Sequence, residues 1–334
     1  MLNTILLFAR IVSLKTRATT VFLIAFTAWS LVPPVALAAQ TITIGTGSRT
    51  GVYILLGKTI CEIIRFQTSQ IKCKVVPSKG SVDNVKGLTD GRFDISIVQS
   101  DVHHHAVRGQ AMFKGTGPNG SLRSLFSAYQ ESLAVIVSSK SSISSIKNFP
   151  GKHINIGPNG SGSNTTMRMI LAMNGWKSAI FKKVEMLSNN AQANKFCKKN
   201  LEVFTYVTGH PNPLVKNILR NCKAKMINIT GPAIDQLIGR YPYYVKTTIP
   251  RTAYIGLDQN VTSIGMLATV LTTTRLDDRV AYLVTQAVFE SLKKIRSINE
   301  VFRYLHPIEM ATRGMTAPLH KGALRYLQTS GRVK

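Results

Sequence analysis

Apolar and polar residues alternate along this chain in a way that predicts strands and helices in turn. The segment 41–45 (TITIG) alternates with a period of two, as a half-buried strand does, and 53–66 places its aliphatic residues at helical spacing. The first half of the chain is therefore predicted to hold strands at 41–45, 73–77 and 95–98 and helices at 53–66 and 81–91.

The same alternation begins again in the second half of the chain. The unbroken apolar run 133–137 (LAVIV) predicts a strand buried on both faces, and a second apolar segment spans 261–272. After Asp277, apolar residues at helical spacing predict one helix as far as Ile295. Between the two apolar segments we expect strands at 152–157 and 203–207 and helices at 165–174 and 191–200. Two successive β-α arrays predict an α/β fold with two lobes.

The first forty residues have the features of an export signal. Basic residues precede an apolar run over 21–38, which ends in the small-x-small pattern Ala36-Leu37-Ala38. A membrane anchor is the alternative, because the run nearly reaches the roughly 20 residues that span a bilayer. A proline pair inside the run favours cleavage. We therefore expect residues 1–39 to be a signal peptide and the mature protein to be periplasmic.

The composition is that of a globular protein with an unusual charge. The chain has 334 residues, of which 44% are hydrophobic, and this argues against disorder, collagen and coiled coil. Its 42 lysine and arginine residues against 15 aspartate and glutamate residues give a net charge of +27. The basic residues are scattered and no nucleic-acid-binding motif accompanies them, so we expect no nucleic-acid partner.

The four cysteines fall into two local pairs. Cys61 lies in the first predicted helix and Cys73 opens the next strand, so a helix packed on its own sheet brings them within disulfide distance. Cys197 and Cys222 repeat this relation. Four free thiols, or pairings that join the two lobes, are the alternatives. We predict the disulfides Cys61–Cys73 and Cys197–Cys222, in keeping with export.

Two glycine-rich loops each stand between a predicted strand and a predicted helix. They are 45–51 (GTGSRTG) and 157–165 (GPNGSGSNT). Such loops expose backbone N–H groups at a helix N-terminus, which suits a carboxylate or a phosphate. Either loop alone has a purely structural alternative, a tight turn, so it is the pair that indicates a ligand site. The glycine spacing matches neither the dinucleotide fingerprint nor the P-loop.

Catalytic chemistry has little support in the sequence. The 15 carboxylates form no evident catalytic pair, and HExxH and GxSxG motifs are missing, so we expect no catalytic residue, no metal and no cofactor. The run His103-His104-His105 suggests a metal, but consecutive histidines point in different directions, and we favour a solvated helix start. His210 follows a predicted buried strand, where it either meets a ligand or caps local backbone.

Seven segments in one order resemble the TAXI family, the extracytoplasmic solute receptors of TRAP transporters, which include immunogenic periplasmic proteins of alphaproteobacteria. The resemblance extends over essentially the whole mature chain. The segments are 45–57 (GTGSRTGVYILLG), 79–101 (KGSVDNVKGLTDGRFDISIVQSD), 122–137 (LRSLFSAYQESLAVIV), 151–167 (GKHINIGPNGSGSNTTM), 206–213 (YVTGHPNP), 228–250 (NITGPAIDQLIGRYPYYVKTTIP) and 316–327 (TAPLHKGALRYL). The chain departs from the family at Arg49, at Lys79 and at Tyr129-Gln130-Glu131, where a proline usually precedes the glutamate.

The resemblance implies an α/β, two-lobed periplasmic-binding-protein-like fold of type II, whose lobes close on a solute without catalysis. It implies lobe 1 from 40–138 plus 258–334 and lobe 2 from 139–257. Because the expected site is divided between strands of different lobes, we predict that they close about a hinge near 137–139 and 257–263. Carried over by position, the implied ligand-binding residues are Thr46, Gly47, Ser48, Tyr53, Gly80, Ser81, Asn84, Gln99, Ser100, Asp101, Ser161, Gly162, Ser163, Asn164, Thr165, Val207, Gly209 and His210.

Two functions follow as hypotheses. By resemblance, the chain is a monomeric receptor that delivers a small anionic metabolite, such as glutamate or 2-oxoglutarate, to the membrane subunits of a TRAP permease. The alternative is an exported binding protein that acts as a sensor or surface adhesin without transport and uses its basic face. Binding to heparin or DNA that persists at about 0.15 M salt favours the second function, because exposed charge is screened over about 8 Å there.

Overall fold

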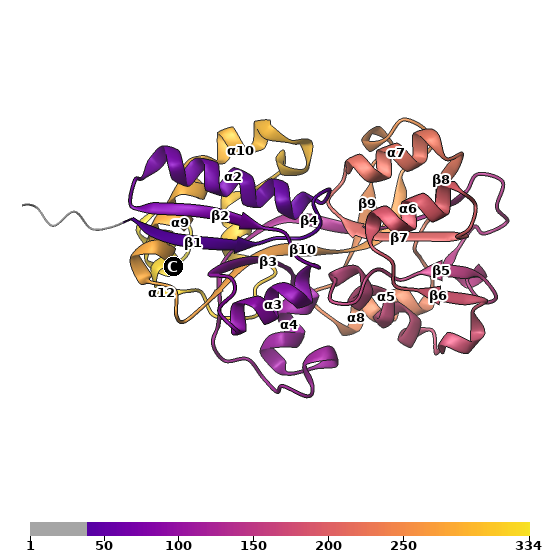
Figure 1. Cartoon of the computed structure of the whole chain (residues 1–334), viewed down its shortest axis with the longest axis horizontal. Coiled ribbons are helices and arrows are strands. Elements are labelled where there is room, and N and C mark those ends of the chain that lie inside the picture. Colours follow the sequence, from indigo (N-terminus) through magenta and orange to yellow (C-terminus); the bar gives the residue numbers. More distant parts are fainter. Residues whose placement is uncertain (1–38) are drawn as a thin grey trace, which may run out of the picture. The chain divides into compact units, whose positions relative to one another are not determined.

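The computed structural model describes residues 39–334, so the expected signal peptide lies outside the described residues apart from Ala39. Among residues 39–334, no helix combines the length and apolar character needed to cross a membrane. The described residues form one compact unit from Gln40 to Lys334, built on a single mixed sheet with helices on both faces (Figure 1).

The first third of the unit alternates parallel strands with helices, as the sequence predicts. Strand β1 lies between β2 and β3 and pairs with both in parallel. The strands are β1 (Gln40–Gly45), β2 (Ile71–Val76) and β3 (Ile95–Gln99). The helices are α2 (Val52–Gln67), α3 (Ser81–Thr89) and α4 (Ser100–Arg108).

Two long strands then carry the chain from one lobe to the other and back. Strand β4 (Leu122–Ser138) pairs with β10 (Val261–Thr273) over its first part. From Ser132 onward β4 pairs with β7 (Val203–Thr208), and β8 (Ala224–Met226) also pairs with its end. Strand β10 in turn pairs with β9 (Val245–Ile249) first and with β3 afterwards. These two strands are the connection between the lobes.

The second lobe repeats the order of the first. Short strands β5 (His153–Asn155) and β6 (Lys183–Glu185) lie beside β7, and the whole sheet runs β2-β1-β3-β10-β4-β7-β5-β6. Its helices are α5 (Gly162–Met173), α6 (Asn189–Cys197), α7 (Pro213–Asn221) and α8 (Pro232–Arg240). The chain ends on the first lobe with α9 (Asp278–Glu290), α10 (Leu292–Ile298), α11 (Pro307–Thr312) and α12 (Lys321–Thr329).

The hydrophobic core divides in the same way as the sheet. Two clusters hold apolar residues up to Tyr129 and from Ala268 onward, and two others hold those from Leu133 to Met266. Along β4 the change from one core to the next therefore falls between Tyr129 and Leu133, where the strand also changes its partner. Each lobe has a core of its own, which is what allows two lobes to move relative to one another.

Two elements differ from the sequence-based expectation. The predicted strand 133–137 is only the second half of β4, which begins at Leu122. Its first half escapes the apolar pattern because it buries serines, and Ser124 donates a hydrogen bond to the carbonyl oxygen of Ala317 at 2.9 Å. The helix predicted to reach Ile295 is divided at Ser291 into α9 and α10. In β4 a contact with a distant segment, and after α9 an irregular backbone at Ser291, outweigh the local sequence pattern.

The prediction of a solvated helix start at the three histidines is wrong. They lie inside α4, where His103 is fully buried and His105 is 3% exposed. The Nε2 atom of His103 accepts a hydrogen bond from the backbone N–H of Ala317 at 2.9 Å, and the ring of His105 packs on Tyr243. Burial lowers the pKa of His103 to about 3 and that of His105 to about 4, so both rings are neutral.

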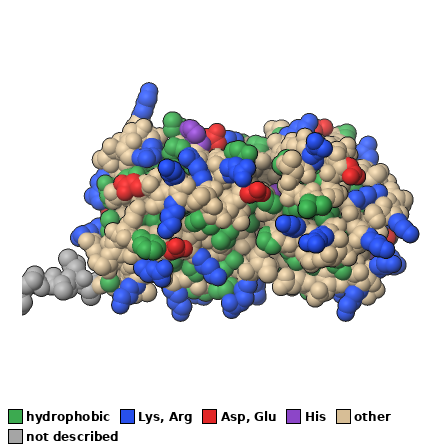
Figure 2. Space-filling model, turned by 90° about the horizontal axis from the view of Figure 1, so that it is seen from above, with side chains coloured by type: hydrophobic (Ala, Val, Ile, Leu, Met, Phe, Trp, Pro, Cys, Tyr) green, Lys and Arg blue, Asp and Glu red, His purple; other side chains and the backbone are tan. Residues whose placement is uncertain are grey.

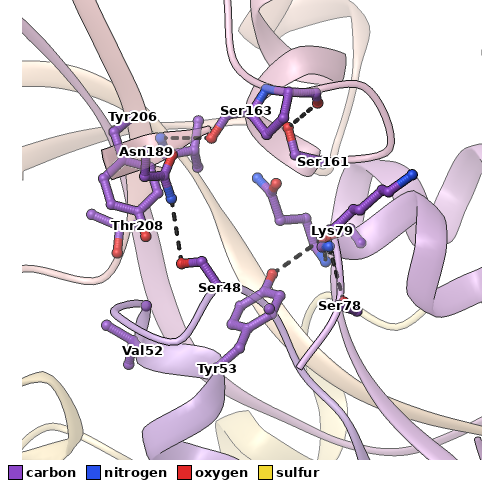
Figure 3. Close-up of a pocket in the computed structure, with 18 of the residues that line it drawn as sticks. Ser48, Val52, Tyr53, Ser78, Lys79, Ser161, Ser163, Asn189, Tyr206 and Thr208 are labelled. Atoms are coloured by element: carbon purple, nitrogen blue, oxygen red, sulfur yellow. Dashed lines mark hydrogen bonds between the residues drawn. The ribbon is translucent and has the colours of Figure 1, made fainter. Parts of the chain in front are cut away.

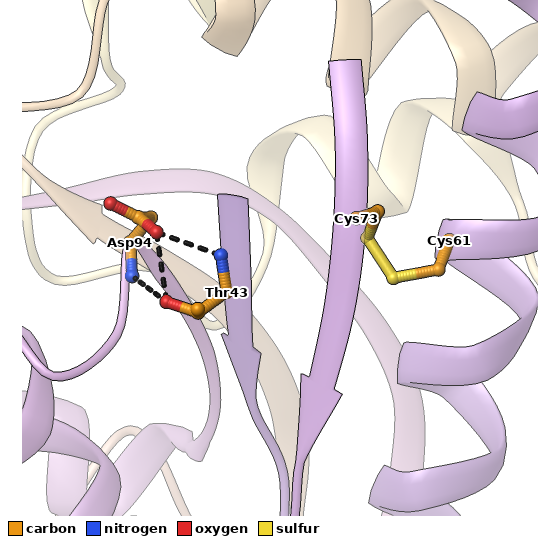
Figure 4. Close-up of a disulfide and its surroundings, with 4 residues drawn as sticks. All are labelled: Thr43, Cys61, Cys73 and Asp94. Atoms are coloured by element: carbon orange, nitrogen blue, oxygen red, sulfur yellow. Dashed lines mark hydrogen bonds between the residues drawn. A yellow bond between two sulfur atoms is a disulfide. The ribbon is translucent and has the colours of Figure 1, made fainter. Parts of the chain in front are cut away.

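Both predicted disulfides are confirmed. Cys61 of α2 bonds to Cys73 of β2 with their Cα atoms 5.2 Å apart, and Cys197 bonds to Cys222 with a Cα separation of 4.9 Å. Figure 4 shows the first of these, beside the hydrogen bonds that join Thr43 of β1 to Asp94. Each bridge lies within one lobe, so neither restricts the movement of one lobe against the other.

The surface reflects the net charge of the sequence. On the face shown in Figure 2, lysine and arginine side chains are scattered over both lobes and acidic side chains are few. No single basic patch stands out on that face. On this face the charge therefore acts as a general positive potential rather than as a local binding site.

Candidate functional site

A pocket of about 240 Å³ lies between the lobes and is lined by residues from both. Figure 3 shows its labelled side chains arranged around an open centre. From the first lobe it is lined by Gly47, Ser48, Gly51, Val52, Tyr53, Ser78, Lys79, Gly80, Ser81, Gln99 and Glu131. From the second lobe it is lined by Pro158, Ser161, Gly162, Ser163, Ser188, Asn189, Tyr206, Val207 and Thr208.

Four helices begin at this pocket. The N-cap residues of α2, α3, α5 and α6 are Gly51, Gly80, Ser161 and Ser188, and all four line it. The first N–H groups of a helix lack partners within the helix, and they form the positive end of its dipole. Four helix N-termini around one cavity favour the binding of an anion. They do not determine which anion it is.

The second glycine-rich loop positions α5 through its own side chains. Oγ of Ser161 accepts a hydrogen bond from the backbone N–H of Asn164 at 3.1 Å, which is the usual role of a serine N-cap. Oγ of Ser163 accepts one from the backbone N–H of Val207 at 3.1 Å and so ties the helix to the end of β7. The loop is thus held rigidly against the strand ends.

The lobes touch each other at the edge of the pocket. The backbone N–H groups of Val82 and Asp83 donate to the carbonyl oxygen of Gly160 at 3.0 and 3.2 Å. Asn189 donates to Oγ of Ser48 at 3.5 Å. The N-terminus of α3 therefore satisfies two of its N–H groups with the opposite lobe.

Gln99 extends from the first lobe to the start of α5. A Cβ atom at position 162 would overlap Oε1 of Gln99, so only glycine there lets the carboxamide lie against the helix. Gln99 is 3% exposed, and its Nε2 atom is buried without a hydrogen-bond partner among the described residues. This donor is therefore available to a molecule bound in the cavity.

The floor of the pocket holds a carboxyl group among phenols. Glu131 of β4 is 3% exposed, and its Oε2 atom accepts a hydrogen bond from the hydroxyl group of Tyr53 at 2.7 Å. The pKa of Glu131 is raised to about 8, mainly by burial; the bond from Tyr53 opposes this rise, and the nearby charge of Asp101 adds to it. Burial likewise raises the pKa of Tyr206 to about 12, so its hydroxyl group is neutral.

Ten of the residues implied by the resemblance line the pocket. They are Gly47, Ser48, Tyr53, Gly80, Ser81, Gln99, Ser161, Gly162, Ser163 and Val207. Arg49, which departs from the family pattern, is exposed and lies outside the lining. Both glycine-rich loops therefore contribute to one cavity.

The other eight implied residues lie behind the lining. Thr46, Asn84, Ser100, Asp101, Asn164, Thr165, Gly209 and His210 belong to this group. Most bond to backbone: Asn84 donates to the carbonyl oxygen of Ile97 at 2.7 Å, and Ser100 accepts from the N–H of Leu267 at 3.1 Å. The Nε2 atom of His210 lies 3.1 Å from the carbonyl oxygen of Ser132. These side chains support the walls of the pocket.

Ten lining residues were not among those expected. They are Gly51, Val52, Ser78, Lys79, Glu131, Pro158, Ser188, Asn189, Tyr206 and Thr208. Ser188 precedes a predicted helix and carries a typical N-cap signal. Glu131 lies in the polar stretch 130–132 just before the apolar run 133–137, and the sequence there does not distinguish a buried carboxyl group from an exposed one. Tyr206 and Thr208 continue a strand whose neighbour Val207 was expected. For Pro158 the sequence holds no distinct signal.

Within the described part of the chain, no group of three or more histidine, cysteine, aspartate and glutamate side chains is arranged to hold a metal ion. What the pocket offers is hydrogen-bond donors, hydroxyl groups and one buried carboxyl group. This set suits the reversible binding of a small polar molecule.

Comparison with known proteins identifies a family and a fold. The sequence matches the model of the NMT1-like family over residues 44–331. The structure is similar to that of a protein from Bordetella bronchiseptica RB50, with 14% identity, a TM-score of 0.52, and 87% of this chain and 82% of that chain covered. This likeness concerns the fold alone. With the strand order described above, the expected two-lobed α/β fold of type II is confirmed.

Two further solved structures are similar at a lower score. One is the alkanesulfonate-binding protein SsuA from Xanthomonas axonopodis pv. citri bound to MOPS, with 14% identity, a TM-score of 0.47, and 78% of this chain and 74% of that chain covered. The other is a putative periplasmic sulfonate-binding protein SsuA from Methylobacillus flagellatus KT, with 14% identity, a TM-score of 0.47, and 88% of each chain covered.

Proposed function

The chain belongs to the NMT1-like family, and on that premise we propose that it is a periplasmic solute receptor that binds a small anionic metabolite between its lobes. The observation that carries this proposal is the pocket itself, because residues of both lobes and four helix N-termini surround it. Such an arrangement favours a carboxylate, whose oxygens accept hydrogen bonds from several backbone N–H groups at once.

The finer assignment is a TRAP-type receptor of the TAXI kind, which delivers an amino acid or organic acid to the membrane subunits of a permease and works as a monomer without catalysis. Its support is the resemblance of the seven sequence segments. Export through a signal peptide at 1–39 is part of this proposal, and the two disulfides support it, because disulfides form and persist in oxidising compartments.

The proposed lobes are 40–138 plus 258–334 and 139–257. The division of the hydrophobic core lies nearer the middle of both crossing strands, between Tyr129 and Leu133 and between Met266 and Ala268. We therefore place the bending segment of the proposed hinge at these positions of β4 and β10, where both strands change partners.

A thermal-shift screen of the mature protein tests the proposed function. The probes are organic acids and amino acids, with uncharged sugars and inorganic cations as controls. A ligand at 100 times its dissociation constant is expected to stabilise the protein by about 2.7 kcal/mol. A screen in which only sugars or cations raise the melting temperature contradicts the proposal.

The scattered basic surface favours a second candidate, an exported sensor or adhesin that binds polyanions without transport. Retention on heparin at about 0.15 M salt, by a protein that binds no small anion, would support this candidate over the first.

A further inference from the structure

Glu131 is a buried carboxyl group that faces the proposed solute. It lines the pocket from β4, it is 3% exposed, and the hydroxyl group of Tyr53 donates to its Oε2 atom at 2.7 Å. In the described part of the chain no side chain or backbone group forms a hydrogen bond with its Oε1 atom. One oxygen of Glu131 is thus held in place, and the other is free to meet a ligand.

Within residues 39–334, this carboxyl group forms no ion pair with a lysine, arginine or histidine. Among residues 39–334, ion pairs are formed by five other glutamates, Glu62, Glu185, Glu202, Glu300 and Glu309. The titratable groups that surround Glu131 are phenols and an acid: Tyr53 of α2, Tyr129 of β4, Tyr206 of β7 and Asp101 of α4.

Two further groups near the pocket do not supply a balancing positive charge. His210, whose Nε2 atom lies 3.1 Å from the carbonyl oxygen of Ser132, has its pKa lowered by burial to about 4 and is neutral. Lys79 lines the pocket, but its side chain is exposed to solvent. An ionised Glu131 would therefore lie buried without a counter-ion, which is costly, and the usual outcome is that the group keeps its proton.

We propose that Glu131 binds the solute as a neutral acid, donating a hydrogen bond from Oε1 to a carboxylate oxygen of the solute while Oε2 accepts from Tyr53. This inference rests on the proposed function, since it requires an anionic oxygen in the pocket. It removes an apparent conflict in the site, where helix N-termini attract an anion and an acidic side chain would otherwise repel it.

The surroundings of Glu131 agree with this role. Burial raises the pKa of its carboxyl group to about 8, above the pH at which most proteins work. A bound carboxylate adds a negative charge beside it and raises that pKa further. Glu131 therefore keeps its proton when the solute binds. At a pH where Glu131 of the unliganded protein has lost its proton, binding is accompanied by proton uptake.

The competing assignment is that an ionised Glu131 accepts a hydrogen bond from an ammonium group of the solute. The two assignments predict opposite pH dependence. A neutral acid binds best below pH 8 and loses affinity above it, whereas an ionised carboxylate gains affinity for an amine as the pH rises. They also differ in the effect of glutamine, which can donate a hydrogen bond but cannot pair with an ammonium group.

Calorimetric titration of the mature protein distinguishes them, with glutarate and L-glutamate as probes that differ by one amino group. For the wild type, we expect constant affinity from pH 6 to 7 and a loss of about tenfold per pH unit well above pH 8. For Glu131→Gln, we expect an affinity about 3- to 10-fold weaker at pH 7, as for an altered hydrogen bond, with no further loss up to pH 9.5. Glu309→Gln, on the exposed face of α11, is the matched control and should keep the wild-type profile.

A second variant keeps the test informative if Glu131→Gln does not fold. Tyr53→Phe removes the hydrogen bond that favours ionised Glu131, so the loss of affinity should move to higher pH. Two results overturn the inference but leave the proposed function standing. One is a wild-type affinity that stays constant up to pH 9.5. The other is a wild-type affinity for L-glutamate that rises with pH and is lost in Glu131→Gln. If the probes and every other carboxylate in the screen fail to bind the wild type, the inference and the proposed function are both overturned.

Discussion

The hydroxyl group of Tyr244 donates a hydrogen bond to Oδ2 of Asp101 across 2.9 Å, and this bond joins the two lobes. The same oxygen accepts a second bond, from the hydroxyl group of Thr166 in α5 at 3.1 Å. Asp101 lies in the first turn of α4 and is fully buried. A side chain of the first lobe is therefore held by two hydroxyl groups of the second, behind the pocket rather than in it.

We predict that Tyr244→Phe lowers the free energy of unfolding by about 1 to 3 kcal/mol, because the buried carboxyl group loses one of its two donors from the opposite lobe. Urea denaturation at pH 7 measures the change. Tyr304→Phe, at a tyrosine that is 84% exposed, is the control and should stay within about 0.5 kcal/mol of the wild type. Equal effects of the two variants would show that the bond between the lobes contributes nothing.

The same carboxyl group makes stability depend on pH. Burial raises the pKa of Asp101 from 3.8 to about 6, although its hydrogen bonds from Tyr244 and Thr166 oppose the rise. The folded state therefore binds this proton more tightly than the unfolded state. The contribution of Asp101 is fully present below about pH 4 and is lost as the pH rises through about 6, an effect of about 3 kcal/mol.

Asp101→Asn should remove this decline. We expect the difference in unfolding free energy between the variant and the wild type to move in favour of the variant from pH 4 to pH 7. Asp258→Asn, at an exposed residue, should run parallel to the wild type over that range. Parallel curves for Asp101→Asn as well would show that Asp101 titrates alike in the folded and unfolded states.

Gly162 is predicted to control the position of Gln99 in the pocket. In Gly162→Ala the new methyl group would overlap Oε1 of Gln99, so the flexible carboxamide must move away from α5. We expect an affinity for a carboxylate solute about 3- to 10-fold weaker, as for one lost hydrogen bond, with little change in melting temperature. Gly239→Ala, in α8 where an added Cβ atom meets nothing within 4 Å, is the control and should bind normally.

The two disulfides are predicted to stabilise their lobes separately. They close loops with sequence separations of 12 and 25 residues. In the chain-entropy estimate, replacing Cys61 and Cys73 by alanine costs about 3 kcal/mol, and replacing Cys197 and Cys222 costs about 3.5 kcal/mol. Urea denaturation of each double variant measures these losses. Wild-type protein whose unfolding is unaffected by a reducing agent that opens both bridges would contradict the prediction.

Solute binding is predicted to close the lobes, because the pocket is divided between them and, among residues 40–334, the chain crosses from one lobe to the other through β4 and β10. Small-angle scattering should show a smaller radius of gyration with a tightly bound solute than without it. An unchanged radius with a solute of demonstrated affinity would mean that the lobes keep the arrangement described here in both states.

Much of the fold follows from the sequence alone. The period-two run of β1 and the helical spacing in α2 are local patterns, and local sterics decide them. The disulfide pairing was also accessible, because Cys61 and Cys73 lie on a helix and the strand that follows it, a short connection with few alternative geometries. The sequence also predicts both glycine-rich loops of the pocket, because in each case the strand, the glycine turn and the helix N-terminus are contiguous in the chain.

The tertiary structure decided what depends on distant partners. His103 is buried where its ring accepts a hydrogen bond from Ala317, more than two hundred residues away, and no local pattern records such a contact. Likewise, Ser124 in the first half of β4 is buried where it donates a hydrogen bond to the distant Ala317. Whether Glu131 lies in solvent or in the floor of a pocket depends on where Tyr53 and the crossing strands bring it. The sequence determines which titratable side chains are present. Their charge states depend on burial and on contacts with distant groups, and both arise only when the chain folds.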